Sequence, residues 1–110
     1  MNDYIGQLEY TNSLILKLVN DIKHYRNNNC IIIVLGDHGS RFFEKISDKE
    51  DEHYTILSSF YFPDHDYQAL YDSISHVNIF RSIFRKYFGE DQARLPDKQD
   101  FVWPAGSRNK

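Results

Sequence analysis

The sequence has little that would crosslink its fold, anchor it in a membrane or attract nucleic acid. Cys30 is the single cysteine among 110 residues, so no internal disulfide can form. No apolar run approaches the roughly 20 residues that a bilayer-spanning helix needs. Thirteen Lys and Arg residues against sixteen Asp and Glu residues give a net charge of −3. They form no basic cluster, which disfavours nucleic acid as the main partner.

The apolar and aromatic residues that are present predict a single modest globular domain. Apolar positions that alternate in steps of three and four predict an amphipathic helix over residues 3–25, and three asparagines end it. A second helix is predicted over residues 75–88, with Ser73 or Ser75 as its N-cap and Gly89 as its terminator. We expect its aromatic face, which includes Phe80, Phe84 and Phe88, to lie in the core.

Two segments are typical of strands. Residues 30–35 are an unbroken apolar run rich in isoleucine, which indicates a strand buried on both faces. Residues 54–62 are rich in aromatic and β-branched side chains and end at a proline. Helix, short turn and buried strand form half of a βαβ crossover. We therefore expect an α/β fold with few, mainly parallel strands flanked by the two helices.

The residues that follow the first strand are the strongest chemical signal in the chain. Asp37, His38 and Gly39 come directly after residues 30–36, at the place where open α/β sheets bind their ligands. A carboxylate beside an imidazole, followed by a glycine that permits a sharp turn, is a plausible half of a metal site. The alternative is that Asp37 caps a turn and that His38 is an ordinary surface residue.

Two further residues are candidates for the same edge. His53 ends an acidic loop and opens the second strand, which would bring it back toward Asp37; alternatively it is an exposed loop histidine. Arg41 lies close after the Asp-His pair, and its planar guanidinium suits a phosphate or sulfate group. An ordinary surface ion pair would explain Arg41 equally well.

Four stretches agree, in order, with a known family. Residues 4–22, 32–41 (IIVLGDHGSR), 54–63 and 75–89 resemble the helix, metal-binding strand, later strand and closing helix of the alkaline phosphatase superfamily. Within that superfamily the sequence is most similar to the sulfatase-like branch. The resemblance covers roughly residues 4 to 103, and Gly-Asp-His-Gly in this setting is its most specific element.

This resemblance implies a metal-dependent hydrolase or transferase that acts on anionic sulfate or phosphate esters. Asp37 and His38 match the pair that binds a divalent metal ion, which is Zn, Mn or Ca, and Arg41 would bind the substrate. In two-metal members a histidine near His53 completes a second site. Sulfatases proper use one calcium and a lysine, for which Lys45 or Lys49 is the nearest equivalent, so both sub-branches stay open. In both, the metal would polarise the ester oxygen.

The family's nucleophile and its other metal-binding carboxylates have no counterpart here. We therefore expect residues 1–110 to be the C-terminal segment of a larger sulfatase-like domain, with 104–110 as a disordered tail. The segment would carry no nucleophile and would have the missing N-terminal half as its partner. Such parents are often membrane-anchored, with an extracytoplasmic catalytic domain. The alternatives are a non-catalytic α/β interaction module and a phosphomutase-type member of the same superfamily.

Overall fold

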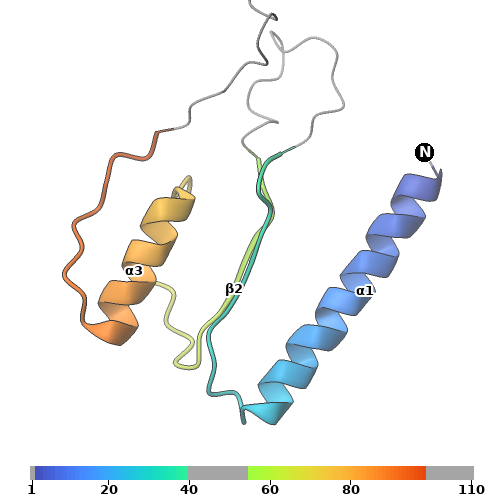
Figure 1. The fold of residues 1–110 in the computed structure, drawn as a ribbon, viewed down its shortest axis with the longest axis horizontal. Coiled ribbons are helices and arrows are strands. Elements are labelled where there is room, and N and C mark those ends of the chain that lie inside the picture. Colours follow the sequence, from blue (N-terminus) through green and yellow to red (C-terminus); the bar gives the residue numbers. More distant parts are fainter. Residues whose placement is uncertain (1, 40–54, 99–110) are drawn as a thin grey trace, which may run out of the picture. The chain divides into compact units, whose positions relative to one another are not determined.

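The structure is a computed structural model that describes residues 2–39 and 55–98. Its elements are α1 (Asn2–Tyr25), β1 (Ile32–Leu35), β2 (Ser58–Tyr61) and α3 (His76–Phe88), in that order (Figure 1). The chain divides into two compact units, Met1–His65 and Asp66–Lys110, and each is described by itself below. The two helices and two strands confirm the predicted α/β class and fall close to the predicted positions.

The asparagines after α1 end the helix as predicted. Asn27 and Asn28 adopt left-handed backbone conformations, with φ of 48° and 62°, which short polar side chains tolerate best. The Asn28 N–H donates to the Lys23 carbonyl over 2.8 Å and so closes the last turn. The chain then enters β1 within a few residues, which places β1 directly after the helix.

The apolar face of α1 is only partly covered by the rest of its unit. Ile15, Val19 and Ile22 are half-buried. At the C-terminal end of the helix, the Lys23 ammonium lies 4.3 Å from the centre of the Tyr61 ring on β2, and the Tyr61 hydroxyl donates to the Asn28 carbonyl. Most other large apolar side chains of the helix are exposed: Tyr4, Ile5, Leu8, Tyr10, Leu14, Leu16, Leu18 and Tyr25.

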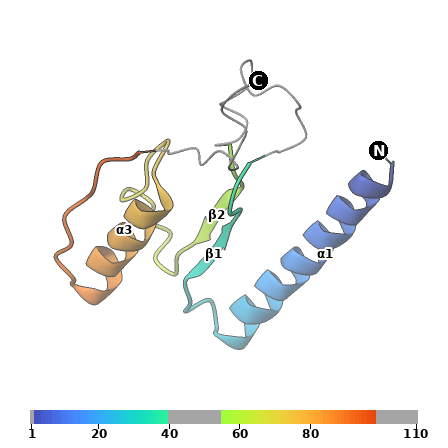
Figure 2. The same cartoon turned by 45° about the horizontal axis from the view of Figure 1, so that its top comes forward.

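The two strands form an antiparallel pair, in which Ile32 faces Tyr61 and Leu35 faces Ser58 (Figure 2). The Gly36 N–H donates to the Leu57 carbonyl over 2.9 Å. The residue before β2 therefore lies beside the residue after β1, at the C-terminal end of β1. This arrangement makes the pair antiparallel, and the expected parallel pairing is not present among the described residues. All four residues of β1 are half-buried among the described residues. The expectation that this strand is buried on both faces was therefore wrong for the described part of the chain.

The second unit is built on α3, which is capped by Ser75, one of the two predicted N-caps, and by Gly89, the predicted terminator. The Ser75 hydroxyl accepts a hydrogen bond from the Asn78 N–H over 3.4 Å, and Gly89 takes a left-handed conformation with φ of 69°. The buried face of the helix is Asn78, Ile79, Ser82 and Ile83.

The aromatic residues of α3 do not lie on its buried face. Phe80, Phe84 and Phe88 are exposed, and their rings contact one another at i, i+4 spacing. The prediction that they form the core was therefore wrong. The helix instead buries a narrower stripe of four residues, and two of them, Asn78 and Ser82, are polar. Because two of its residues are polar, the buried stripe has a weaker apolar pattern in the sequence than the row of Phe80, Phe84 and Phe88. The sequence therefore indicated the wrong face of the helix as the buried one.

A polar cluster fastens residues 90–98 to α3. The Asn78 amide donates to the Leu95 carbonyl (2.7 Å) and to Asp97 Oδ1 (2.7 Å), and its carbonyl accepts from the Leu95 N–H (3.0 Å). Asp97 also accepts from the Tyr71 hydroxyl (2.6 Å) and the Ser75 N–H (2.8 Å). These bonds, that of Tyr71 first, hold the pKa of Asp97 well below its usual range, and the bond to Asp97 raises the pKa of Tyr71.

Candidate metal site

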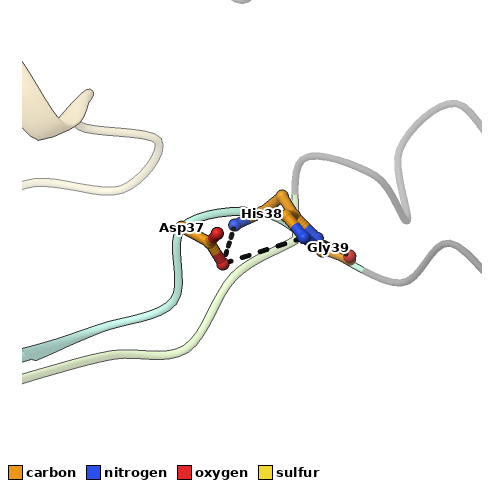
Figure 3. Close-up of polar contacts among 3 residues, drawn as sticks. All are labelled: Asp37, His38 and Gly39. Carbon is orange, nitrogen blue, oxygen red and sulfur yellow. Dashed lines mark hydrogen bonds and ion pairs between the residues drawn. The ribbon is translucent and has the colours of Figure 1, made fainter.

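Asp37 and His38 lie in the turn that follows β1, where the sequence placed them (Figure 3). The Asp37 carboxylate accepts a hydrogen bond from the His38 N–H over 3.0 Å, through Oδ1. This bond stabilises the turn, so the alternative that Asp37 caps a turn also applies in part. It engages one oxygen only, and the Asp37 side chain remains 91% exposed. The second oxygen is available to a ligand.

The imidazole of His38 is held in one tautomer. Its Nδ1 lies 2.7 Å from the Gly39 carbonyl oxygen. A carbonyl only accepts hydrogen bonds, so Nδ1 carries a proton, and in the neutral form of the ring the lone pair is on Nε2. A metal-binding histidine is commonly oriented in this way, by a backbone carbonyl on its other nitrogen. His38 is 43% exposed, so an ion can reach Nε2.

The His38 ring and the Asp37 carboxylate lie close together (Figure 3). His38 Nε2 is 3.8 Å from Asp37 Oδ1, the oxygen that also accepts the hydrogen bond from the His38 N–H. Two ligands bound to one tetrahedral ion at about 2.0–2.1 Å are about 3.3 Å apart. A small rotation of either exposed side chain supplies the difference, so one nitrogen and one carboxylate oxygen fit a shared divalent ion. Imidazole suits zinc, and carboxylate oxygen suits manganese or calcium, so the pair does not select a metal.

The described part of the site is incomplete as a metal centre. Protein metal sites use at least three ligands in most cases. Within residues 2–39 and 55–98, no group of three or more His, Cys, Asp or Glu side chains is placed to hold an ion. The other predicted residues of this edge lie outside the described ranges: Arg41, His53, Lys45 and Lys49. The structure brings Asp37 and His38 together and does not test the other four.

Two other described histidines, His65 and His76, have different surroundings from His38. His65 packs edge-on against Tyr61 with ring centres 5.6 Å apart, and its backbone is left-handed. His76 is the first residue of α3.

The sequence reasoning missed the Asn78–Asp97 cluster, because its partners are 17 to 19 residues apart and no local pattern joins them. That cluster joins α3 to the 71–75 and 95–97 segments of the same unit.

Comparison with known proteins gives one result. A protein-family model described as Sulfatase matches residues 1–85. No curated protein and no solved structure gave a match. No helix in the described ranges combines the length and apolar character needed to cross a membrane. The matched range includes α1, the β1 strand with Asp37 and His38, β2 and most of α3. This range is more than half of the chain, and the chain therefore belongs to the sulfatase family, the sulfatase-like branch of the alkaline phosphatase superfamily.

Proposed function

We propose that this chain contributes metal ligands to the catalytic centre of a sulfatase-like enzyme that cleaves or transfers sulfate or phosphate esters. The observation that carries the proposal is the Asp37–His38 turn, in which the Gly39 carbonyl fixes the Nδ1 proton and leaves Nε2 open. Membership of a family that is generally metal-dependent supports it. Asp37 and His38 are the proposed ligands of one divalent ion, with His53 as a ligand of a second ion in a two-metal centre.

When bound, the ion would neutralise charge that develops on the ester oxygens. The residues of this chain orient the site. The Gly39 carbonyl accepts the hydrogen bond of Nδ1, which fixes the orientation of the ring and directs Nε2 outward. The His38 N–H holds one carboxylate oxygen of Asp37 and so limits the rotation of that side chain. Arg41 is proposed to bind the anionic group of the substrate through its guanidinium fork.

We further propose that the nucleophile and the remaining ligands come from an N-terminal half of the same domain. Two ligands cannot close a metal centre by themselves. The α1 face carries several exposed large apolar side chains, among them Leu8, Leu14 and Leu18. Within the described ranges β1 pairs with β2 alone, so its other edge is available to a further strand. We propose that this free edge of β1 pairs with a strand of a mainly parallel sheet in the assembled domain.

The test is metal affinity measured by calorimetry with Zn²⁺, Mn²⁺ and Ca²⁺ in turn. Asp37→Ala and His38→Ala should each weaken binding by about tenfold or more, the effect typical of losing a ligand or its support. The chain offers a matched control in Asp64 and His65, a second Asp-His dipeptide that follows β2 at the opposite end of the strand pair. Asp64→Ala and His65→Ala should leave metal affinity unchanged.

Binding that survives both Asp37→Ala and His38→Ala, or that falls equally in the Asp64 and His65 variants, would overturn the assignment. Absence of metal binding in the assembled parent domain would favour the interaction-module alternative. Aryl sulfatase and phosphatase assays test the second part of the proposal. We expect no metal-dependent turnover from the 110-residue chain alone, and an ordinary enzymatic rate would refute the need for a second half. A phosphomutase-type parent would instead transfer phosphate between hydroxyl groups.

A further inference from the structure

A solvent-open pocket lies within the second unit, apart from the residues assigned to the metal site. Its volume is about 290 Å³, which accommodates a small ligand rather than a single water molecule. Three segments line it: the loop after β2 through Asp66 and Ala69, α3 through Arg85 and Lys86, and the 90–98 segment through Arg94. All of them belong to the unit that begins at Asp66, so the pocket is a feature of one body.

The charge of the pocket is positive. Arg85, Lys86 and Arg94 line it against one carboxylate, that of Asp66. The Lys86 ammonium lies 2.8 Å from Asp66 Oδ2 and is largely buried, with 16% of its side chain exposed. This ion pair neutralises the one acidic group of the lining. Two guanidinium charges remain, and neither forms an ion pair with any residue in the part of the chain that the structure describes.

Both guanidinium groups are positioned by backbone carbonyls. Arg85 donates from one terminal nitrogen to the Gln92 carbonyl, and Arg94 donates from one terminal nitrogen to the Ala69 carbonyl over 3.2 Å. The Arg94 guanidinium also lies 4.8 Å from the centre of the Tyr71 ring. Each group has five N–H donors, so these contacts restrict its orientation while leaving donors for a ligand. A carbonyl does not cancel the charge, and both side chains are exposed.

We propose that this pocket binds the phosphate or sulfate group of a small anion, with Arg85 and Arg94 as its donors. Guanidinium forks match the spacing of oxygens on a tetrahedral anion and bind it in bidentate fashion. Two such groups on different segments, each held by a carbonyl, are pre-organised for that geometry. The site does not depend on Asp37 or His38, and the proposal stands or fails independently of the metal centre.

The test is a titration of the 110-residue protein with inorganic phosphate, followed by the NMR shifts of backbone amides. Chloride at matched ionic strength is the reference. Saturable shifts should concentrate in residues 66–69, 82–86 and 92–94. Arg85→Gln and Arg94→Gln should each weaken binding about tenfold, because each removes charge-assisted hydrogen bonds. Arg26→Gln removes the same charge from an exposed position after α1 and should change nothing. His38→Ala should also bind phosphate normally.

Shifts that do not saturate, that spread over both units, or that weaken as much in Arg26→Gln would overturn the proposal. Dispersed amide spectra of the two pocket variants establish that they are folded, and either variant alone suffices for the comparison. Glycerol phosphate and vesicles of phosphatidic acid present the same group in a soluble ester and in a membrane. Competition by one of them with inorganic phosphate identifies the source of the ligand, and competition by neither identifies the free inorganic anion as the ligand.

Discussion

Replacing Asn78 by alanine should release residues 90–98 from α3. The side chain is fully buried. It makes two hydrogen bonds with Leu95, one with the Asp97 carboxylate and a longer one, of 3.4 Å, with the Tyr71 hydroxyl. At about 1 kcal/mol for each of the three shorter bonds, their loss costs about 3 kcal/mol. Alanine favours the helix by about 0.6 kcal/mol over asparagine, and the small cavity left behind offsets that gain. The expected loss of stability in the second unit is therefore about 3 kcal/mol.

Native-state amide hydrogen exchange measures this loss locally, which is necessary because the chain has two units. A loss of 3 kcal/mol corresponds to exchange that is about 100-fold faster, since 1.4 kcal/mol is a factor of ten. The acceleration should appear in residues 79–83 and 95–97 and be absent from α1. The matched control is Asn12→Ala, at an exposed position of α1, which should leave both units as stable as before or slightly stabilise α1.

Unchanged exchange in α3 of the Asn78→Ala variant would refute the reasoning, because the buried amide would then contribute no net stability. Equal acceleration in α1 and α3 would also contradict it. That result would mean that the whole chain unfolds as one body. Asn78→Asp is a useful second variant. It keeps the size of the side chain and places a carboxylate beside that of Asp97, so we expect it to destabilise α3 at least as much as alanine does.

Three other predictions concern single groups. Ser75→Ala removes the N-cap of α3 and should cost about 1 kcal/mol, measured by hydrogen exchange of that helix, whereas Ser75→Asp should retain the cap. Gly89→Ala should destabilise α3 by about 1 kcal/mol, because Gly89 has a φ of 69°. Gly6→Ala, in α1 with open space around it, should stabilise α1 by about as much. Urea unfolding followed by circular dichroism measures the sign of both changes in stability. Hydrogen bonds, that of Tyr71 first, lower the pKa of Asp97, so the stability they contribute is fully present above about pH 4 and is lost as the pH falls toward the folded-state pKa. The difference between the urea midpoints of the wild type and Asp97→Asn should therefore be largest at pH 6 and should begin to decrease as the pH falls below about 4.

Local signals in the sequence predicted the parts of the fold that neighbouring residues determine. Ser75 and Gly89 cap α3 because of their own side-chain chemistry, and the asparagines at 27 and 28 end α1 for the same reason. The place of Asp37 after β1 followed from the end of an apolar run. Each of these depends on a few adjacent residues, so the sequence was sufficient.

Features that depend on distant segments could not be predicted in the same way. The direction of β2 is set by where the chain returns, at Leu57 beside Gly36, and no pattern within either strand encodes it. The burial of Asn78 depends on Leu95 and Asp97, and an asparagine in a helix ordinarily indicates an exposed face. The tautomer of His38 depends on the orientation of one carbonyl, which the sequence does not specify.

The measurement that tests the central claim most directly is the site of metal binding at His38. Mn²⁺ broadens NMR signals near the ion, and Zn²⁺ shifts the nitrogen that binds it. We expect Mn²⁺ to broaden residues 35–39 first, and Zn²⁺ to shift His38 Nε2 while Nδ1 remains protonated, because the Gly39 carbonyl accepts its hydrogen bond. Zinc on Nδ1 would contradict the assignment of Nε2 as the ligating nitrogen. Broadening centred on Asp64 and His65 would contradict the assignment of Asp37 and His38 as the metal ligands.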